Sequence, residues 1–147
     1  MPSNDNYGPS PRAWVREQVE EYEASGGTRA NTLRDTGLPI IIVTTVGRKT
    51  GMTRKFALMR VEKDGDYAVI ASMGGAPENP PWVHNLVADP NVAIQDGPAP
   101  FDATVRLVSG EERESWWKLA VEAFPPYAEY QAKTEREIPV FIASPKG

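Results

Sequence analysis

The stretch that most constrains the fold is Pro39–Val46, which reads PIIIVTTV. It is β-branched almost throughout, and such residues favour a strand over a helix. Polar and apolar residues do not alternate along it, which indicates a strand that is buried on both faces. The chain must therefore place packed structure on each side of this strand.

Further strands and turns follow at short intervals along the chain. Lys63-Asp64-Gly65-Asp66 is a hairpin signal. The expected strands cover residues 39–46, 55–61, 67–73, 91–96, 101–108 and 138–143. The expected helices cover residues 11–24, a short segment opened by Asn79-Pro80-Pro81, a segment starting at a capping box over Ser109–Glu112, and residues 127–136. This order predicts a mainly β (α+β) fold, in which about six antiparallel strands form a small barrel or a strongly curled sheet with flanking helices.

The chain has the size of one domain, with 147 residues. Residues 1–9 are polar and are expected to form a flexible N-terminal arm, which leaves residues 10–147 as a single domain. No apolar run approaches the roughly 20 residues that a membrane-spanning helix needs, and the N-terminus lacks the apolar core of a signal peptide. We therefore expect a cytoplasmic protein, either free or peripheral at the inner membrane face.

Composition excludes several kinds of chemistry. The chain has no Cys, so thiol nucleophiles, disulfides and zinc–thiolate sites are absent. Its only histidine, His84, cannot form a histidine metal cluster by itself. The net charge of −4 argues against nucleic acid as a partner of the whole molecule. Composition leaves the oligomeric state open between a monomer and a homodimer.

A dense group of cations lies at one predicted turn. Arg48, Lys49, Arg54 and Lys55 fall within nine residues of a segment bounded by two glycines. Glycines allow the backbone to approach a ligand closely, and arginine can grip a phosphate or carboxylate with two hydrogen bonds. In a chain of negative net charge the cluster predicts an anion site. A solvated hairpin tip is the alternative interpretation.

Two other segments could line a binding site. Ala71–Pro77 runs from a strand into two glycines, and Trp82 follows shortly after. Tyr127 and Tyr130 lie three residues apart and so share one face of the predicted helix. Each segment also has an ordinary explanation, since a Gly-Gly pair is usually a turn and large aromatics usually pack in a core. The chain thus offers binding groups and few reactive ones, a pattern typical of proteins in which a cofactor supplies the chemistry.

Several of these segments together resemble one family. The chain is similar to the deazaflavin (F420)-dependent nitroreductases and quinone reductases of actinobacteria, whose fold is a split β-barrel. The matching segments are Thr44–Gly51, Arg54, Ala71–Ala76, Asn79–Leu86, Asp89-Pro90, Glu112-Arg113, Tyr127–Gln131 and Arg136–Pro139. They keep the family's order and spacing from about residue 36 to the end.

The resemblance implies a role for each segment. Arg48, Lys49 and Arg54 would hold the phosphate and acidic tail of coenzyme F420. Ser72 would contact the substrate or help to protonate it, and Tyr127 and Tyr130 would form a wall of the acceptor pocket. The further residues implied to bind the cofactor are Thr50, Lys55, Ala71, Ser72, Met73, Gly74, Gly75, Pro80, Pro81 and Trp82.

This sequence departs from the family pattern at two positions. Met73 stands where many members have a lysine that contacts phosphate, which could shift that contact to Lys55. Met59 replaces an aromatic residue on the second hairpin strand and is expected to reshape the acceptor pocket.

The function expected from the resemblance is an F420H2-dependent reductase. It would pass a hydride from the reduced deazaflavin to a quinone or a nitroaromatic acceptor. Two alternatives remain open: an FMN-binding oxidoreductase of the same barrel type, and a non-catalytic F420 carrier.

Overall fold

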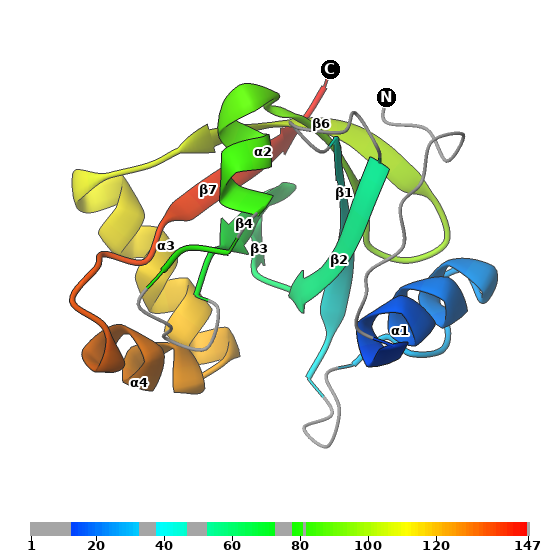
Figure 1. Ribbon diagram of the computed structural model, residues 1–147, viewed down its shortest axis with the longest axis horizontal. Coiled ribbons are helices and arrows are strands. Elements are labelled where there is room, and N and C mark those ends of the chain that lie inside the picture. Colours follow the sequence, from blue (N-terminus) through cyan, green and yellow to red (C-terminus); the bar gives the residue numbers. More distant parts are fainter. Residues whose placement is uncertain (1–12, 33–37, 47–52, 73–77, 81, 147) are drawn as a thin grey trace.

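The computed structural model describes residues 13–32, 38–46, 53–72, 78–80 and 82–146 (Figure 1). Within these ranges the chain forms one antiparallel seven-stranded sheet flanked by helices. The predicted N-terminal arm, residues 1–9, lies outside the described residues.

Strand β1 (Ile40–Val46) is central to the architecture. It pairs antiparallel with β2 (Thr53–Met59) on one side and with β5 (Asn91–Gln95) on the other. Ile40 and Ile42 face one hydrophobic cluster, and Ile41 and Val43 face another. The prediction that this strand is buried on both faces is therefore confirmed.

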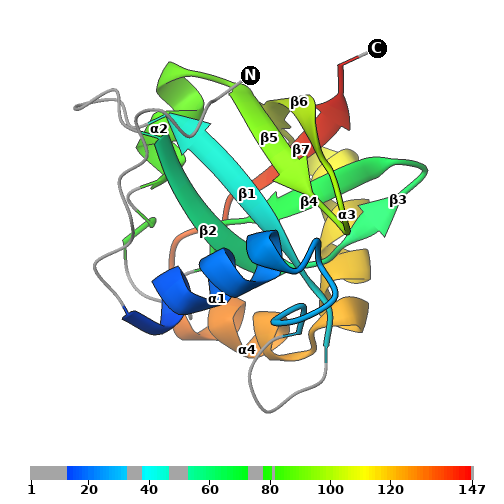
Figure 2. The ribbon, with the colours of Figure 1, turned by 90° about the vertical axis from the view of Figure 1, so that its right-hand side faces the viewer.

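The remaining strands continue the sheet. They are β3 (Glu62–Lys63), β4 (Asp66–Ile70), β6 (Pro100–Leu107) and β7 (Val140–Pro145). The strand order is β2-β1-β5-β6-β7-β4-β3, and the sheet curls strongly along its length (Figure 2). This is a half-barrel, which confirms the mainly β antiparallel prediction. The seventh strand is the short β3, which pairs with β4 through a turn in which Asp64 and Gly65 both have positive φ.

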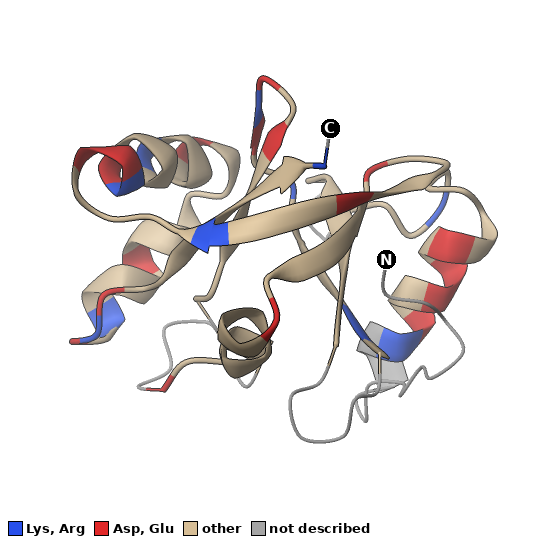
Figure 3. Ribbon diagram, turned by 90° about the horizontal axis from the view of Figure 1, so that it is seen from above, with Lys and Arg blue, Asp and Glu red and all other residues tan. Residues whose placement is uncertain are grey.

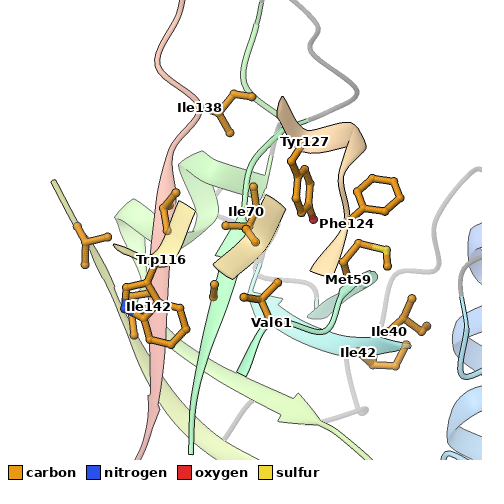
Figure 4. Packing of buried hydrophobic residues seen from close by; sticks show 14 of the residues in the cluster. Ile40, Ile42, Met59, Val61, Ile70, Trp116, Phe124, Tyr127, Ile138 and Ile142 are labelled. Carbon is orange, nitrogen blue, oxygen red and sulfur yellow. The ribbon is translucent and has the colours of Figure 1, made fainter. Parts of the chain in front are cut away.

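The helices cover the two faces of the curled sheet. They are α1 (Ala13–Ala24), α2 (Trp82–Ala88), α3 (Gly110–Ala123) and α4 (Pro126–Lys133). The larger core cluster includes residues of α1, α3 and α4, and Figure 4 shows Met59, Phe124 and Tyr127 close together within it. The smaller cluster packs under α2, which buries Val83 and Leu86 against the other face of β1.

Helix α1 crosses β1 and β2 and is anchored at its C-terminal end (Figure 2). The hydroxyl of Tyr22 accepts a hydrogen bond from the backbone N–H of Gly97 at 2.8 Å and donates one to the carbonyl of Gln95 at 3.3 Å. Gly27 then passes so close to Gly97 that a Cβ at Gly27 would meet the Gly97 backbone at 2.8 Å. The exposed side of α1 is acidic (Figure 3).

Two predictions about helix ends are wrong. Ser109 occupies the N-cap position of α3, but its side chain makes no capping hydrogen bond. The other half of the predicted capping box, Glu112, instead accepts two hydrogen bonds from Arg106, at 2.7 and 2.6 Å. A charged fork competes successfully with a neutral backbone N–H for the same carboxylate. Helix α4 also ends at Lys133, three residues before the predicted end.

None of the helices in the described part of the chain is both long enough and apolar enough to span a membrane.

Candidate cofactor and acceptor site

The predicted cation cluster is divided by the alternation of β2. Arg54 and Lys55 are consecutive strand residues, so their side chains point to opposite faces of the sheet. Arg54 is half-buried and pairs across the sheet with Thr45. Lys55 is buried under α1, where its ammonium donates a hydrogen bond to Glu23 at 2.5 Å. Cofactor binding by Lys55 remains a prediction, and this contact gives the residue a structural role as well.

An aromatic stack lies on the same face as Arg54. Phe56 follows Arg54 by two residues, and its ring stacks on Trp82 at a centroid distance of 4.6 Å and an interplanar angle of 16°. Trp82 begins α2, close after the segment predicted to line the deazaflavin ring. The stack therefore brings the end of the predicted cation cluster and the predicted ring-binding segment to one side of the sheet.

The predicted ring-binding segment begins directly after β4. Ala71 is buried and Ser72 half-buried, and both present backbone carbonyls to Arg136. The Arg136 guanidinium donates to the Ala71 carbonyl at 3.2 Å and to the Ser72 carbonyl at 2.7 Å. It also donates to the Asn79 side-chain oxygen at 2.9 Å. Partial burial lowers the pKa of Arg136, although an arginine remains charged at neutral pH.

Helix α4 carries the two tyrosines predicted for the acceptor pocket. Tyr127 is 3% exposed and packs edge-on against Phe124 at 5.0 Å, and burial raises its pKa well above the ordinary value. Tyr130 is half-buried and lies 6.3 Å from the Tyr127 ring. Met59, expected to shape the acceptor pocket, is buried in the same cluster as Tyr127 (Figure 4). Of the two tyrosines, Tyr130 is the one whose side chain reaches solvent.

The structure describes two further predicted site residues. Pro80 is buried and Trp82 half-buried. Arg48, Lys49, Thr50, Met73, Gly74, Gly75 and Pro81 lie outside the described residues. Their roles remain predictions.

The described residues fit a ligand that has a planar ring and an anionic tail. Arg54 supplies a cation, and the hydroxyl of Thr45 opposite it is buried and finds no hydrogen-bond partner within the described residues. A buried polar atom of this kind is normally satisfied by a ligand or a bound water. The half-buried Ser72 at the end of β4 adds a side-chain hydroxyl that can hydrogen-bond to a heterocycle. These donors and acceptors suit F420.

Sequence reasoning missed two residues that shape this site. Arg136 was noted only as part of a matching motif, and Phe56 was not noted at all. A signal for Phe56 existed, because an aromatic residue two positions from Arg54 on a strand must share its face. No local signal connects Arg136 with Ala71, since the two residues are 65 positions apart.

Comparison with known proteins gives a consistent answer. The family model described as F420H2-dependent quinone reductase matches residues 14–145. An F420H2-dependent quinone reductase of Mycobacterium tuberculosis is 37% identical over 108 residues, which cover 71% of this chain and 72% of that protein.

Two solved structures are similar to this chain. One, described as an F420-H2 dependent reductase, is 57% identical with a TM-score of 0.69, over 72% of this chain and 94% of that one. The other, described as a domain-swapped dimer, is 53% identical with a TM-score of 0.71, over 92% of this chain and all of that one.

The chain belongs to the F420H2-dependent quinone reductase family. This membership confirms the resemblance, the split-barrel fold, the class of oxidoreductase and F420 as the cofactor. The roles of the individual site residues remain predictions.

Proposed function

We propose that this chain transfers a hydride from F420H2 to a quinone bound between the Ala71–Trp82 segment and α4. The observation that carries the proposal is the convergence of Arg54, the Phe56–Trp82 stack and the end of β4 on one side of the sheet. The Arg136 contacts then join this side to the loop that follows α4.

The cations hold the anionic tail of the cofactor in this proposal. Arg54 lies on β2 and supplies one charge, and Arg48 and Lys49, which precede it in the sequence, are proposed to supply two more. Reduced F420 supplies the hydride when bound. The protein supplies orientation and charge complementarity, which can contribute most of the rate acceleration in such reactions.

The acceptor side is assigned to α4 and Ser72. Tyr130 is half-buried and can contact an aromatic acceptor through its ring and its hydroxyl. Tyr127 lies directly behind it in the core and fixes its position. Ser72 is half-buried at the end of β4, where its hydroxyl can donate a proton to the reduced acceptor. We propose quinones as the main acceptors and nitroaromatics as opportunistic ones.

The proposal is tested by cofactor titration followed by turnover. F420 and FMN are titrated against the protein by fluorescence, and F420H2 oxidation is then followed with and without menadione. We expect tighter binding of F420 than of FMN, and oxidation that depends on menadione. Equal or tighter FMN binding would favour the FMN-dependent alternative, and F420 binding without any turnover would favour the carrier.

A matched pair of variants locates the anion site. A charge-assisted contact with phosphate contributes about 1.5–3 kcal/mol, or roughly 10- to 150-fold in affinity. Arg54→Ala and Arg48→Ala should each raise the F420 dissociation constant by at least about tenfold. Arg106→Ala removes the same charge from an exposed pair with Glu112 and should leave that constant unchanged. Equal effects of all three variants would indicate a general charge effect and no local site.

The oligomeric state is also proposed here. Because a similar solved structure is described as a domain-swapped dimer, we propose that this chain forms a homodimer. Light scattering coupled to size-exclusion chromatography measures the mass directly. The mass of a monomer at micromolar concentration would refute the proposed homodimer. The cytoplasmic location remains a prediction, as does the single domain over residues 10–147.

A further inference from the structure

We infer that Arg136 is a positioning residue that fixes the cofactor side of the site relative to α4. The inference rests on the proposed function, because it assigns one side of that site to Ala71, Ser72 and Asn79 and the other side to α4. It concerns the distance between cofactor and acceptor and does not require Arg136 to touch either.

The contacts of Arg136 join residues that are remote in sequence. Its guanidinium binds the carbonyls of Ala71 and Ser72, which are 65 and 64 positions away, and the side chain of Asn79, which is 57 positions away. Ala71 and Ser72 precede the segment 73–77, and Asn79 follows it. One planar cation therefore holds both ends of this segment. A guanidinium suits such a task because its several donors have fixed directions.

Hydrogen bonds from α3 and α4 hold the backbone of the loop that carries Arg136. Its carbonyl accepts a hydrogen bond from the Gln131 side chain of α4 at 2.8 Å. The Gln131 side-chain oxygen accepts from the backbone N–H of Ile138 at 3.0 Å. Arg113 of α3, which is 5% exposed, donates to the Ile138 carbonyl at 2.8 Å. The loop that carries Arg136 is thus braced against α3 and α4, and α4 presents Tyr130 one residue before Gln131.

Removal of Arg136 should loosen the site without unfolding the protein. The backbone N–H of Ala71 still donates to the carbonyl of Pro139 at 3.0 Å, so the end of β4 stays attached to the sheet. The carbonyls of Ala71 and Ser72 lose their charged donor, and Asn79 loses its contact. Ala71, Ser72 and Asn79 can then shift relative to Tyr130. Displacements of about 1 Å at a reacting centre can reduce rates by roughly 100-fold.

The test compares Arg136→Ala and Arg136→Lys with the control Arg106→Ala. Arg106 of β6 also forms a forked pair, but its partner is the exposed Glu112 of α3, away from the proposed site. For Arg136→Ala we expect kcat with menadione to fall on the order of 10- to 100-fold, while the menadione KM changes little. Arg136→Lys should recover part of kcat, because it retains a charged donor. The control should match the wild type.

Amide hydrogen exchange supplies a readout that needs no cofactor. In cofactor-free Arg136→Ala, exchange at the Ala71 amide should accelerate, because its hydrogen bond to Pro139 opens more often once the Ala71 and Ser72 carbonyls lose Arg136. Exchange at the Ile138 amide, which Gln131 still holds, should not accelerate. Acceleration at both amides would indicate general destabilisation and overturn the inference. Unchanged kcat in Arg136→Ala would also overturn it while leaving the proposed function intact. A wild type that neither binds F420 nor oxidises F420H2 would refute the proposed function, and the inference would fall with it.

Discussion

The buried contact between Lys55 and Glu23 allows a sharp test of what Lys55 does. The side chain of Lys55 is 3% exposed, and its ammonium lies 2.5 Å from the carboxylate of Glu23, whose side chain is 31% exposed. This contact ties α1 to β2. Removing one partner from a fully buried ion pair typically costs 3–5 kcal/mol, since a charge is left without its counter-ion.

Replacing Glu23 and replacing Lys55 should lower the free energy of unfolding by different amounts. Glu23→Gln leaves the Lys55 ammonium buried, and the partial exposure of position 23 reduces the expected loss to about 2 kcal/mol. Lys55→Met leaves a carboxylate that water can still reach, so its cost should stay below about 1 kcal/mol. For a chain of this length 1 kcal/mol corresponds to roughly 2–4 °C in melting temperature. Glu23→Gln should therefore melt about 4–8 °C below the wild type.

Denaturant unfolding followed by tryptophan fluorescence measures these losses of stability. F420 titration of the same variants tests whether Lys55 also binds the cofactor. Glu20→Gln makes the same charge change at an exposed position of α1 and serves as the control. If Glu23→Gln is as stable as this control, the reasoning from the ion pair is wrong. If Lys55→Met binds F420 at least about tenfold more weakly while its stability is unchanged, Lys55 acts mainly as the cofactor ligand that the resemblance implies.

Three further predictions follow from the described geometry. Burial and a hydrogen bond to Asp96 raise the pKa of Tyr67 from 10.0 to about 12, so the unfolded chain releases this proton first and the free energy of unfolding should fall as the pH rises from 10 to 12. Because the side chain of Asp96 is 21% exposed and water screens its charge, the loss should be only about 1–2 kcal/mol. Tyr67→Phe should reduce this pH dependence in denaturant titrations, although the buried Tyr127, whose pKa is also raised, still contributes to it. Gly27→Ala should lower the free energy of unfolding by over about 3 kcal/mol, because its Cβ would meet the Gly97 backbone. Gly65→Ala, with positive φ but open space around it, should lower that free energy by only about 1 kcal/mol. Equal losses of stability in thermal melts would contradict this prediction. Tyr130→Ala should change menadione kinetics more than the F420 dissociation constant, and the reverse result would place Tyr130 on the cofactor side.

Local chemistry explains why much of the fold could be predicted. The β-branched run at residues 40–46 specified a strand buried on both faces without any knowledge of its neighbours. The Asp64-Gly65 pair specified a hairpin, because both residues adopt the positive φ that such a turn requires. In each case the information lies within a few consecutive residues.

Predictions failed where a distant charge decided the outcome. Glu112 has the spacing of a capping residue, but Arg106 on the neighbouring strand provides a better partner than the backbone. Lys55 is a different case: its binding to the cofactor together with its neighbour Arg54 remains a prediction, although the two side chains point to opposite faces of the sheet. The expected strand began at residue 55 and the observed one begins at Thr53, so the alternation that separates the two side chains was overlooked.

Candidate binding groups are the part of the site that the sequence reveals. Binding groups gather in short segments, because the cofactor tail needs several cations close together and the ring needs an open backbone. In our proposal, the relative position of cofactor and acceptor depends instead on contacts such as those of Arg136, which join the end of β4 and a residue before α2 to the loop after α4 across more than fifty residues. A motif can therefore reveal what a protein binds, while the distance over which a hydride must travel is set by single long-range contacts. The tightest control of turnover in this chain should accordingly lie at residues that touch neither reactant.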